Sequence, residues 1–214
     1  MKQDPKAGTG NFVSVKTAAV LSILVFIIAV GASAFKKDEA PVKKITFSTI
    51  NRDSIESVKA FETVYKTLMS PRCMNCHPAG DIPLQGDDSH LHVMGPKRGV
   101  EGKGVYAMKC SNCHQETNTP GLHTPPGNPD WHLPPAAMKM VFEGKSAHEL
   151  AIQLMDKKKN GNKDIKKLIE HADDGLVLAV WNPGEGRTLP PVSHAEFKKA
   201  WLTWIKKGAY APKK

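Results

Sequence analysis

Four cysteines and two histidines carry the most specific chemistry in this 214-residue sequence. All four cysteines lie in two pentapeptides, Cys73-Met-Asn-Cys-His77 and Cys110-Ser-Asn-Cys-His114. Cys-x-x-Cys-His is the attachment pattern of haem c. Two thiols three residues apart share one face of a helical turn, so they can add to two vinyl groups on one porphyrin edge while the following imidazole approaches the iron. We therefore expect two covalently bound haem c groups, held by Cys73, Cys76, His77, Cys110, Cys113 and His114.

Three other uses of paired cysteines are weaker. A zinc ribbon also has two Cys-x-x-Cys pairs, but its usual gap is about 15–20 residues, whereas 33 residues separate Cys76 from Cys110. A structural disulfide suits an exported protein, but a Cys-x-x-Cys ring is tight and reducible. A thioredoxin-like motif requires a βαβ context that the sequence lacks.

The second axial ligand of each iron decides between electron transfer and ligand chemistry. His77 and His114 are the expected proximal metal ligands, and His90, His92 and Met138 are the leading candidates for the opposite positions. His90 and His92 follow His77 by 13 and 15 residues, in a Gly-rich loop long enough to fold back over the distal face of the haem. Met138 follows a Pro-rich loop, and small monohaem cytochromes c present their sulfur in a similar arrangement. Further candidates are His132 and His171, for the second haem.

Other side chains suit the surroundings of a haem. Arg72, Lys97 and Arg98 have the positive charge that pairs with propionates. The four tryptophans are more typical of core or haem packing than of redox relays: Trp131, Trp181, Trp201 and Trp204.

The elements that position these residues are mainly helices separated by long loops. Asp53 and Ser54 can cap a helix whose apolar residues follow a three-to-four spacing until Pro71 ends it. Residues 78–104 and 119–135 are rich in Gly and Pro and predict loops, with a short helix from Val105 to His114 between them. The run from Leu176 to Trp181 is the only apolar one of strand length.

Three helices are expected towards the C-terminus. Ser146 with Glu149, and Ser193 with Glu196, are capping boxes ahead of the first and the last. Ile165, Leu168 and Ile169 mark the second helix, and Gly208 is expected to stop the third.

The N-terminus predicts export. Lys2, Lys6 and Lys16 precede an uncharged, mostly apolar run over residues 17–35. It suits either a secretory signal cleaved after Ala34 or a retained membrane anchor, because about 20 residues span a bilayer. We therefore expect a signal sequence or membrane anchor at 1–35, a linker at 36–50 and a dihaem cytochrome c domain at 51–214. That domain would lie on the periplasmic side of the cytoplasmic membrane, anchored or exported.

The net charge of +9 comes from 30 Lys and Arg against 21 Asp and Glu. The basic residues recur in pairs and triplets rather than in one block, which is typical of a solvated basic surface and less so of a dedicated docking patch. No nucleic-acid motif is present. An acidic protein partner is the expected use of this charge, because complementary charges speed encounter.

From Met69 onward the chain resembles small exported dihaem proteins described as isoquinoline 1-oxidoreductase subunit-like. About 140 residues take part, and the strings that carry the likeness are Ser70–Asp81, Gln85–Asp88, Arg98–Gly99, Cys110–Gln115, Trp131–Leu133 and Trp181–Gly184. The resemblance implies a cytochrome that takes electrons from an exported molybdenum hydroxylase. The first 45 residues and the first helix depart from the pattern.

Together these observations predict a mostly α fold, with cytochrome c-like helices and long loops packed around two haems, after an N-terminal apolar helix. The expected function is transfer of single electrons between redox partners, as a subunit of, or mediator for, a respiratory or dehydrogenase complex, and not an enzymatic reaction. The alternatives are a dihaem peroxidase or small-ligand reductase with one open haem iron, and a haem-free zinc interaction module.

Overall fold

A computed structural model describes residues 47–214. The expected signal or anchor at 1–35, and most of the expected linker at 36–50, lie outside the described residues. Helix α2 (Phe47–Leu68) takes in the last four residues of that linker. None of the helices within 47–214 is both long and apolar enough to cross a membrane.

Helix α2 confirms the expected apolar face but not the expected start. Asp53 and Ser54 lie inside the helix rather than at its cap, and Ser54 Oγ donates to the carbonyl of Asn51 (2.8 Å). Phe61 and Val64 are fully buried on its inner face. The helix ends before Pro71, which begins the short helix α3 (Pro71–Met74) because proline suits the first turn of a helix.

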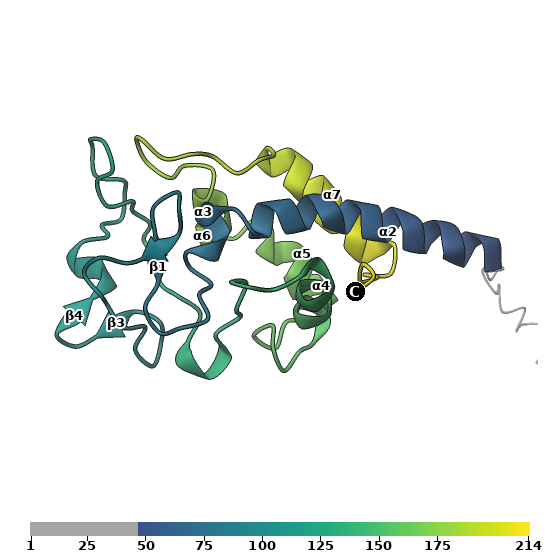
Figure 1. Cartoon of the computed structure of the whole chain (residues 1–214), viewed down its shortest axis with the longest axis horizontal. Coiled ribbons are helices and arrows are strands. Elements are labelled where there is room, and N and C mark those ends of the chain that lie inside the picture. Colours follow the sequence, from purple (N-terminus) through teal and green to yellow (C-terminus); the bar gives the residue numbers. More distant parts are fainter. Residues whose placement is uncertain (1–46) are drawn as a thin grey trace, which may run out of the picture. The chain divides into compact units, whose positions relative to one another are not determined.

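Helix α7 (His194–Lys206) crosses α2 and forms the main helix pair of the fold (Figure 1). Phe61 of α2 packs on Trp204 of α7 with ring centroids 4.7 Å apart. The buried Ser57 hydroxyl donates to the Trp204 carbonyl (2.9 Å). At the surface, Lys207 pairs with Asp53 at 2.7 Å. Buried aromatic area and a satisfied buried hydroxyl therefore hold the two helices together.

Three further helices cover this pair and share its hydrophobic core: α4 (Ala147–Met155), α5 (Ile165–His171) and α6 (Gly175–Ala179). Both predicted capping boxes are confirmed, at Ser146 with Glu149 and at Ser193 with Glu196. The apolar run that begins at Leu176 has the length of a strand but forms α6. Its side chains pack on helices, so no strand neighbour completes a sheet.

Long loops carry both cysteine motifs and contain only two-residue strands. Strands β1 (Leu84–Gln85) and β2 (His90–Leu91) pair antiparallel, as do β3 (Gly104–Val105) and β4 (Met108–Lys109). The expected helix from Val105 to His114 is therefore wrong in its first half, and its second half is a single 3-10 turn, η1 (Cys110–Asn112). Gly104 has φ +89°, and a Cβ there would lie 2.4 Å from the Met108 carbonyl oxygen. Only glycine permits this hairpin.

The expected predominance of helices with long loops is confirmed for the described residues. A second 3-10 turn, η2 (Ala136–Met138), follows the Pro-rich loop. The helices gather at one end of residues 47–214 and the loops with β1, β3 and β4 at the other (Figure 1). The second cysteine motif thus lies where little regular structure holds the backbone, whereas the first begins in α3.

Replacing Ser193 with alanine should lower the free energy of unfolding by about 1 kcal/mol, because the Ser193 hydroxyl accepts the Glu196 N–H at the start of α7. Urea unfolding of the exported protein measures this. Thr203→Ala removes a hydroxyl that only bonds back to the Lys199 carbonyl within α7 and should change the value by less than about 0.5 kcal/mol. Equal effects of the two substitutions would contradict the capping role.

Candidate functional site

The first cysteine motif is folded as the chemistry of attachment requires. Cys73 lies in α3, and the turn continues because the Cys76 N–H donates to the Cys73 carbonyl (3.2 Å) and the His77 N–H to the Met74 carbonyl (2.9 Å). Desolvation raises the pKa of Cys73 to about 12 and that of Cys76 to about 11. Both residues are half-buried, Cys73 packs against the hydrophobic core, and the raised pKa values keep both thiols protonated.

The second motif is more open to solvent. Cys110 and the next two residues form η1, and the His114 N–H donates to the Cys110 carbonyl (2.9 Å). Cys110 is half-buried, with its pKa raised by desolvation, whereas Cys113 is exposed. The two motifs share a turn-like backbone but differ in how far their thiols are removed from water.

The imidazole of His77 is held by a backbone carbonyl and an aromatic ring. Its Nδ1 lies 2.7 Å from the Met140 carbonyl oxygen. Its face stacks on Phe142, with centroids 3.9 Å apart and planes at 12°. Burial lowers the pKa of His77 to about 4, so the ring is neutral at physiological pH. Met140 reaches this position with φ +48°, an unusual conformation for a residue with a side chain.

The imidazole of His114 is held in the same way by different residues. Its Nδ1 lies 2.7 Å from the Pro126 carbonyl oxygen. Its face stacks on Trp131, with centroids 4.1 Å apart and planes at 9°. Desolvation lowers the pKa of His114, which favours the neutral ring. Trp131, expected to pack in the core or on a haem, thus supports the second imidazole.

These contacts determine which nitrogen of each ring is free. A carbonyl oxygen can only accept, so Nδ1 of His77 and of His114 carries the proton and Nε2 keeps its lone pair. An imidazole that donates its other N–H to a carbonyl is the usual second-shell arrangement of a histidine metal ligand. The sequence did not predict that Phe142 stacks on His77, or that the carbonyls of Met140 and Pro126 bind the two imidazoles. A backbone carbonyl is present in every residue, so the residue type gives no signal for it.

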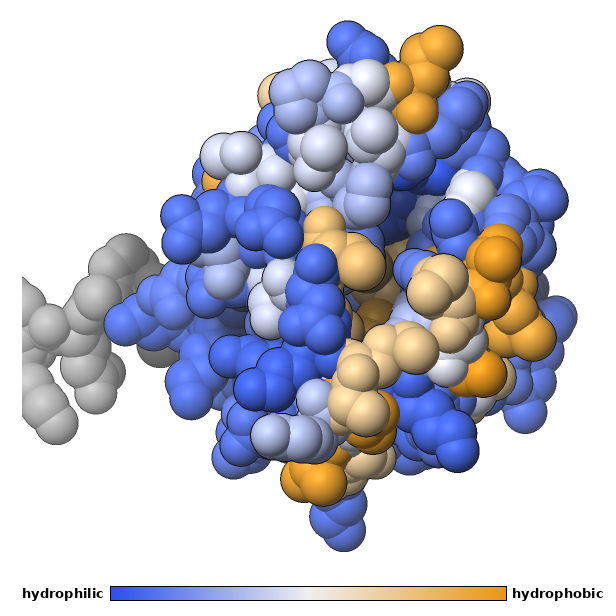
Figure 2. All heavy atoms as spheres, turned by 90° about the vertical axis from the view of Figure 1, so that its left-hand side faces the viewer, coloured by the Kyte–Doolittle hydropathy of each residue, from blue (hydrophilic) through white to orange (hydrophobic). Residues whose placement is uncertain are grey.

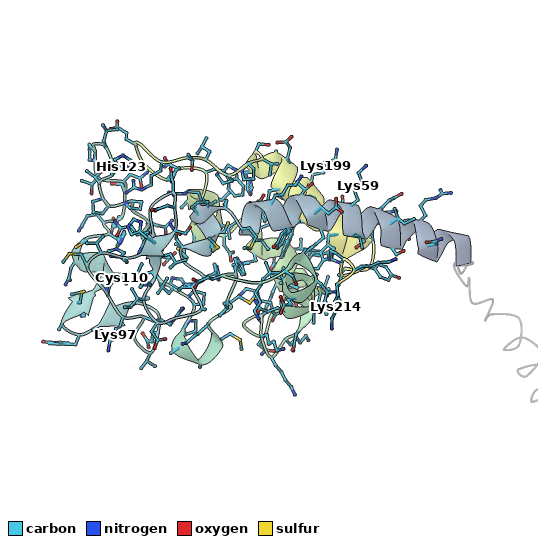
Figure 3. The ribbon with its side chains drawn as sticks, viewed as in Figure 1. Lys59, Lys97, Cys110, His123, Lys199 and Lys214 are labelled. Carbon is cyan, nitrogen blue, oxygen red and sulfur yellow. The ribbon has the colours of Figure 1, made fainter. Side chains whose placement is uncertain are left out.

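The two motifs lie close together in space. The Cys110 thiol is near enough to contribute to the raised pKa of Cys76, after desolvation. Cys110 lies at the loop end of the described residues (Figure 3). Groups attached at the two motifs would therefore be neighbours.

Of the candidate second ligands, His92 has the clearest position. Its ring centroid is 6.4 Å from that of His114. A metal–imidazole bond is about 2 Å and each nitrogen is about 1.1 Å from its ring centroid, so two imidazoles on opposite sides of one metal have centroids about 6 Å apart. The sequence analysis expected His92 to fold back over the haem at His77, but the structure places it beside His114. Its Nδ1 accepts a 3.3 Å hydrogen bond from the Met94 N–H, so the proton of the neutral ring lies on Nε2. Ligation through Nε2 would require the other tautomer and the loss of this hydrogen bond.

The other two candidates are placed differently. His90 lies in β2, half exposed, with its Nδ1 2.6 Å from the Asp88 carboxylate. Met138 is the last residue of η2 and half-buried, and its N–H donates to the Pro135 carbonyl (2.9 Å). The Asp88 contact leaves His90 Nε2 with its lone pair, as a ligand requires. Among the described residues, however, no contact brings His90 to His77 or His114, and none singles out Met138.

Two buried arginines lie beside the first motif. Arg98 is 1% exposed and donates to the carbonyls of Gly80 (3.0 Å) and Pro134 (2.6 Å). Arg72 donates to the Gly86 carbonyl (3.1 Å) and pairs with Asp87. In the described part of the chain, the Nε atoms of both arginines are buried without a hydrogen-bond partner. An acidic group that accepts from them would remove this cost, so the arginines fit the propionates of a haem better than the exposed Lys97 does.

The surface around the second motif is unusually apolar. Figure 2 views this end and shows hydrophobic residues around a recess. The large exposed apolar residues of the adjoining segment are Leu91, Val93, Met94, Val100, Val105, Tyr106 and Met108. Apolar patches of this kind mark ligand grooves or interaction surfaces. They fit a large flat apolar group such as a porphyrin.

Comparisons with family models, curated proteins and solved structures found no match to the chain.

Proposed function

We propose that the protein is a dihaem c-type cytochrome that transfers single electrons between redox partners outside the cytoplasmic membrane. One observation carries the proposal: each Cys-x-x-Cys-His motif presents a neutral imidazole whose Nδ1 is bound to a carbonyl and whose Nε2 is free. A zinc ribbon or a pair of disulfides does not require that arrangement next to each cysteine pair. The orphaned arginine Nε atoms and the apolar recess support a large group with acidic substituents.

The roles of the residues follow from their chemistry. Cys73 and Cys76, and Cys110 and Cys113, would form thioethers, while His77 and His114 would ligate the iron through Nε2. Haem iron supplies one-electron chemistry when it is bound. Phe142 and Trp131 hold the imidazole planes, and Arg72 and Arg98 would pair with propionates.

The proximity of Cys76 and Cys110 supports direct electron exchange between the two sites. His92 would close the second axial position at His114, and a closed iron favours electron transfer over ligand chemistry. These features favour a carrier over a peroxidase or small-ligand reductase.

The partners are part of the same proposal. The proposed redox partner is an exported molybdenum hydroxylase, implied by the resemblance of the cysteine strings, or a membrane respiratory complex. The net charge of +9 suits an acidic face on the protein it meets. The apolar N-terminal run would either direct export or retain the protein at the membrane.

The test is the covalent haem content of the protein exported in a host that matures c-type cytochromes. After acid extraction of free haem, the expected mass is that of the polypeptide plus two haems, and the reduced-minus-oxidised spectrum should be that of haem c. Carbon monoxide should leave the reduced spectrum unchanged if both irons are six-coordinate. A mature exported chain without porphyrin would contradict the proposal, and carbon monoxide binding to native protein would favour the enzymatic alternative.

A further inference from the structure

The peptide group between Pro126 and Gly127 is hydrogen-bonded on both sides. Its carbonyl oxygen is the acceptor that lies 2.7 Å from His114 Nδ1. Its N–H, which belongs to Gly127, donates to Asn118 Oδ1 at 2.8 Å. Because a peptide group is planar and stiff, the side-chain amide of Asn118 and the imidazole of His114 are joined through one rigid unit.

The orientation of the Asn118 amide follows from its neighbours. The Gly127 N–H can only donate, so the amide atom that faces it is the oxygen. The amide nitrogen, on the other side, donates to the Asn182 carbonyl at 3.0 Å and lies 3.3 Å from Asn182 Oδ1. Both ends of the amide therefore have a partner, and the half-buried Asn118 side chain is held in one orientation.

Asn118 and Gly127 meet because the two ends of the loop that follows the second motif lie side by side. The Asn128 N–H donates to the Gln115 carbonyl at 2.9 Å. A Cβ on Gly127 would lie 2.1 Å from the Thr117 carbonyl oxygen, so only glycine permits this close approach. The loop thus brings the Gly127 N–H to Asn118 while the Pro126 carbonyl points at His114.

Other neighbours of this loop act at different atoms. Arg187 Nη2 donates to the Thr124 carbonyl at 2.7 Å, two residues before Pro126. Trp131 stacks on the imidazole itself. Among residues 47–214, Asn118 and His114 are the side chains that hydrogen-bond to the peptide group between Pro126 and Gly127.

A hydrogen bond at one end of a peptide group affects the bond at the other end. Linked hydrogen bonds polarise one another, so an acceptor on the Gly127 N–H makes the Pro126 oxygen a stronger acceptor. A stronger acceptor at Nδ1 in turn raises the basicity of Nε2, the nitrogen that would bind a metal. Asn118 can therefore act on His114 without touching it.

We propose that Asn118 is a positioning residue for His114. Through the peptide group between Pro126 and Gly127, it holds the acceptor of the Nδ1 proton in place and increases electron donation from Nε2 at the second attachment site. This inference rests on the proposed haem-carrying function, because second-shell hydrogen bonding is one of the features that set the reduction potential of a haem.

The test combines two measurements on the haem-loaded protein and its Asn118→Ala variant. Hydrogen exchange of the Gly127 amide should become about two- to tenfold faster, the factor that corresponds to the loss of one hydrogen bond. Potentiometric titration should show one of the two reduction potentials raised and the other unchanged, because a less basic imidazole stabilises the oxidised iron less.

Two further variants separate this role from a purely structural one. Asn182→Ala removes one partner of the Asn118 amide nitrogen but leaves the contact with Gly127, so it should change neither potential. Asn118→Asp keeps an oxygen that accepts from the Gly127 N–H but can no longer donate to the Asn182 carbonyl. In this variant the Gly127 amide should exchange as in the unsubstituted protein, and neither potential should rise.

Three results would overturn the inference. The first is an Asn118→Ala variant with faster Gly127 exchange and two unchanged potentials, which would make Asn118 a structural residue only. The second is a potential raised equally by Asn182→Ala and Asn118→Ala. The third is a raised potential in Asn118→Asp, which applies even if the alanine variant does not fold. Unsubstituted protein without covalent haem would instead contradict the proposed function, and its mass distinguishes the two failures.

Discussion

Replacing Cys73 and Cys76 together with alanine should reduce the covalent haem of the exported protein from two per chain to one. In the proposed dihaem protein each haem would be held by one motif, so loss of both thioethers would remove one porphyrin and leave the other. Cys73 and Cys76 are half-buried, and Cys73 packs against the hydrophobic core, so this loss should also open the packing between α3 and that core. The mass of the acid-extracted protein gives the haem count, and urea unfolding gives the change in stability.

The matched control is the corresponding double substitution of Cys110 and Cys113. It should also leave one haem per chain, but with a smaller loss of stability, because Cys113 is exposed whereas Cys73 and Cys76 are both half-buried. A full complement of two haems after either double substitution would contradict the assignment of the motifs. Equal stability losses would contradict the difference in burial between the two sites.

Replacing Arg98 with alanine should lower the free energy of unfolding by about 3–5 kcal/mol, because hydrogen bonds to a charged group contribute about 1.5–3 kcal/mol each. Its guanidinium joins the Gly80 carbonyl, three residues after the first motif, to the Pro134 carbonyl in the loop after the second. The substitution would leave both carbonyls without this partner and detach the two segments. Urea unfolding of haem-loaded protein measures the effect.

Two further substitutions separate the hydrogen bonds from the charge. Arg98→Lys keeps the positive charge but not the planar fork, and it should recover only part of the lost stability. Lys97→Ala replaces an exposed neighbour of Arg98, and its free energy of unfolding should lie within about 0.5 kcal/mol of that of the unsubstituted protein. A loss below about 1 kcal/mol for Arg98→Ala would show that the two segments are held by other contacts.

The sequence predicted the helical part of the fold where local signals act alone. The capping boxes at Ser146 and Ser193 and the helix around Leu168 depend on residues within one or two turns, so their spacing suffices. The predicted start of α2 was wrong because Asp53 and Ser54, which are typical capping residues, lie within the helix. The hairpin before Cys110 was not predicted because its strands are two residues long, which is too short to show an alternation of apolar and polar residues.

The sequence predicted the residues of the two Cys-x-x-Cys-His motifs as the candidate site, but it did not predict the groups that hold the two imidazoles. Cys73, Cys110 and their partners follow from spacing alone. The contact from His77 to the Met140 carbonyl joins residues 63 positions apart, and any residue type has such a carbonyl. His92 was a candidate, but its position beside His114 depends on how the Gly-rich loop folds rather than on its distance along the chain from His77.

The use of main-chain acceptors at both imidazoles has a consequence for how the protein can vary. No side-chain exchange at Pro126 or Met140 deletes the oxygen that orients the ring, since every amino acid supplies the same one. Substitutions at these positions therefore leave Nε2 as the unprotonated nitrogen, as long as the backbone of the loop is unchanged. Variation would reach the metal through backbone torsion instead, and the left-handed conformation at Met140 is the place where a glycine would be tolerated and a β-branched residue would not.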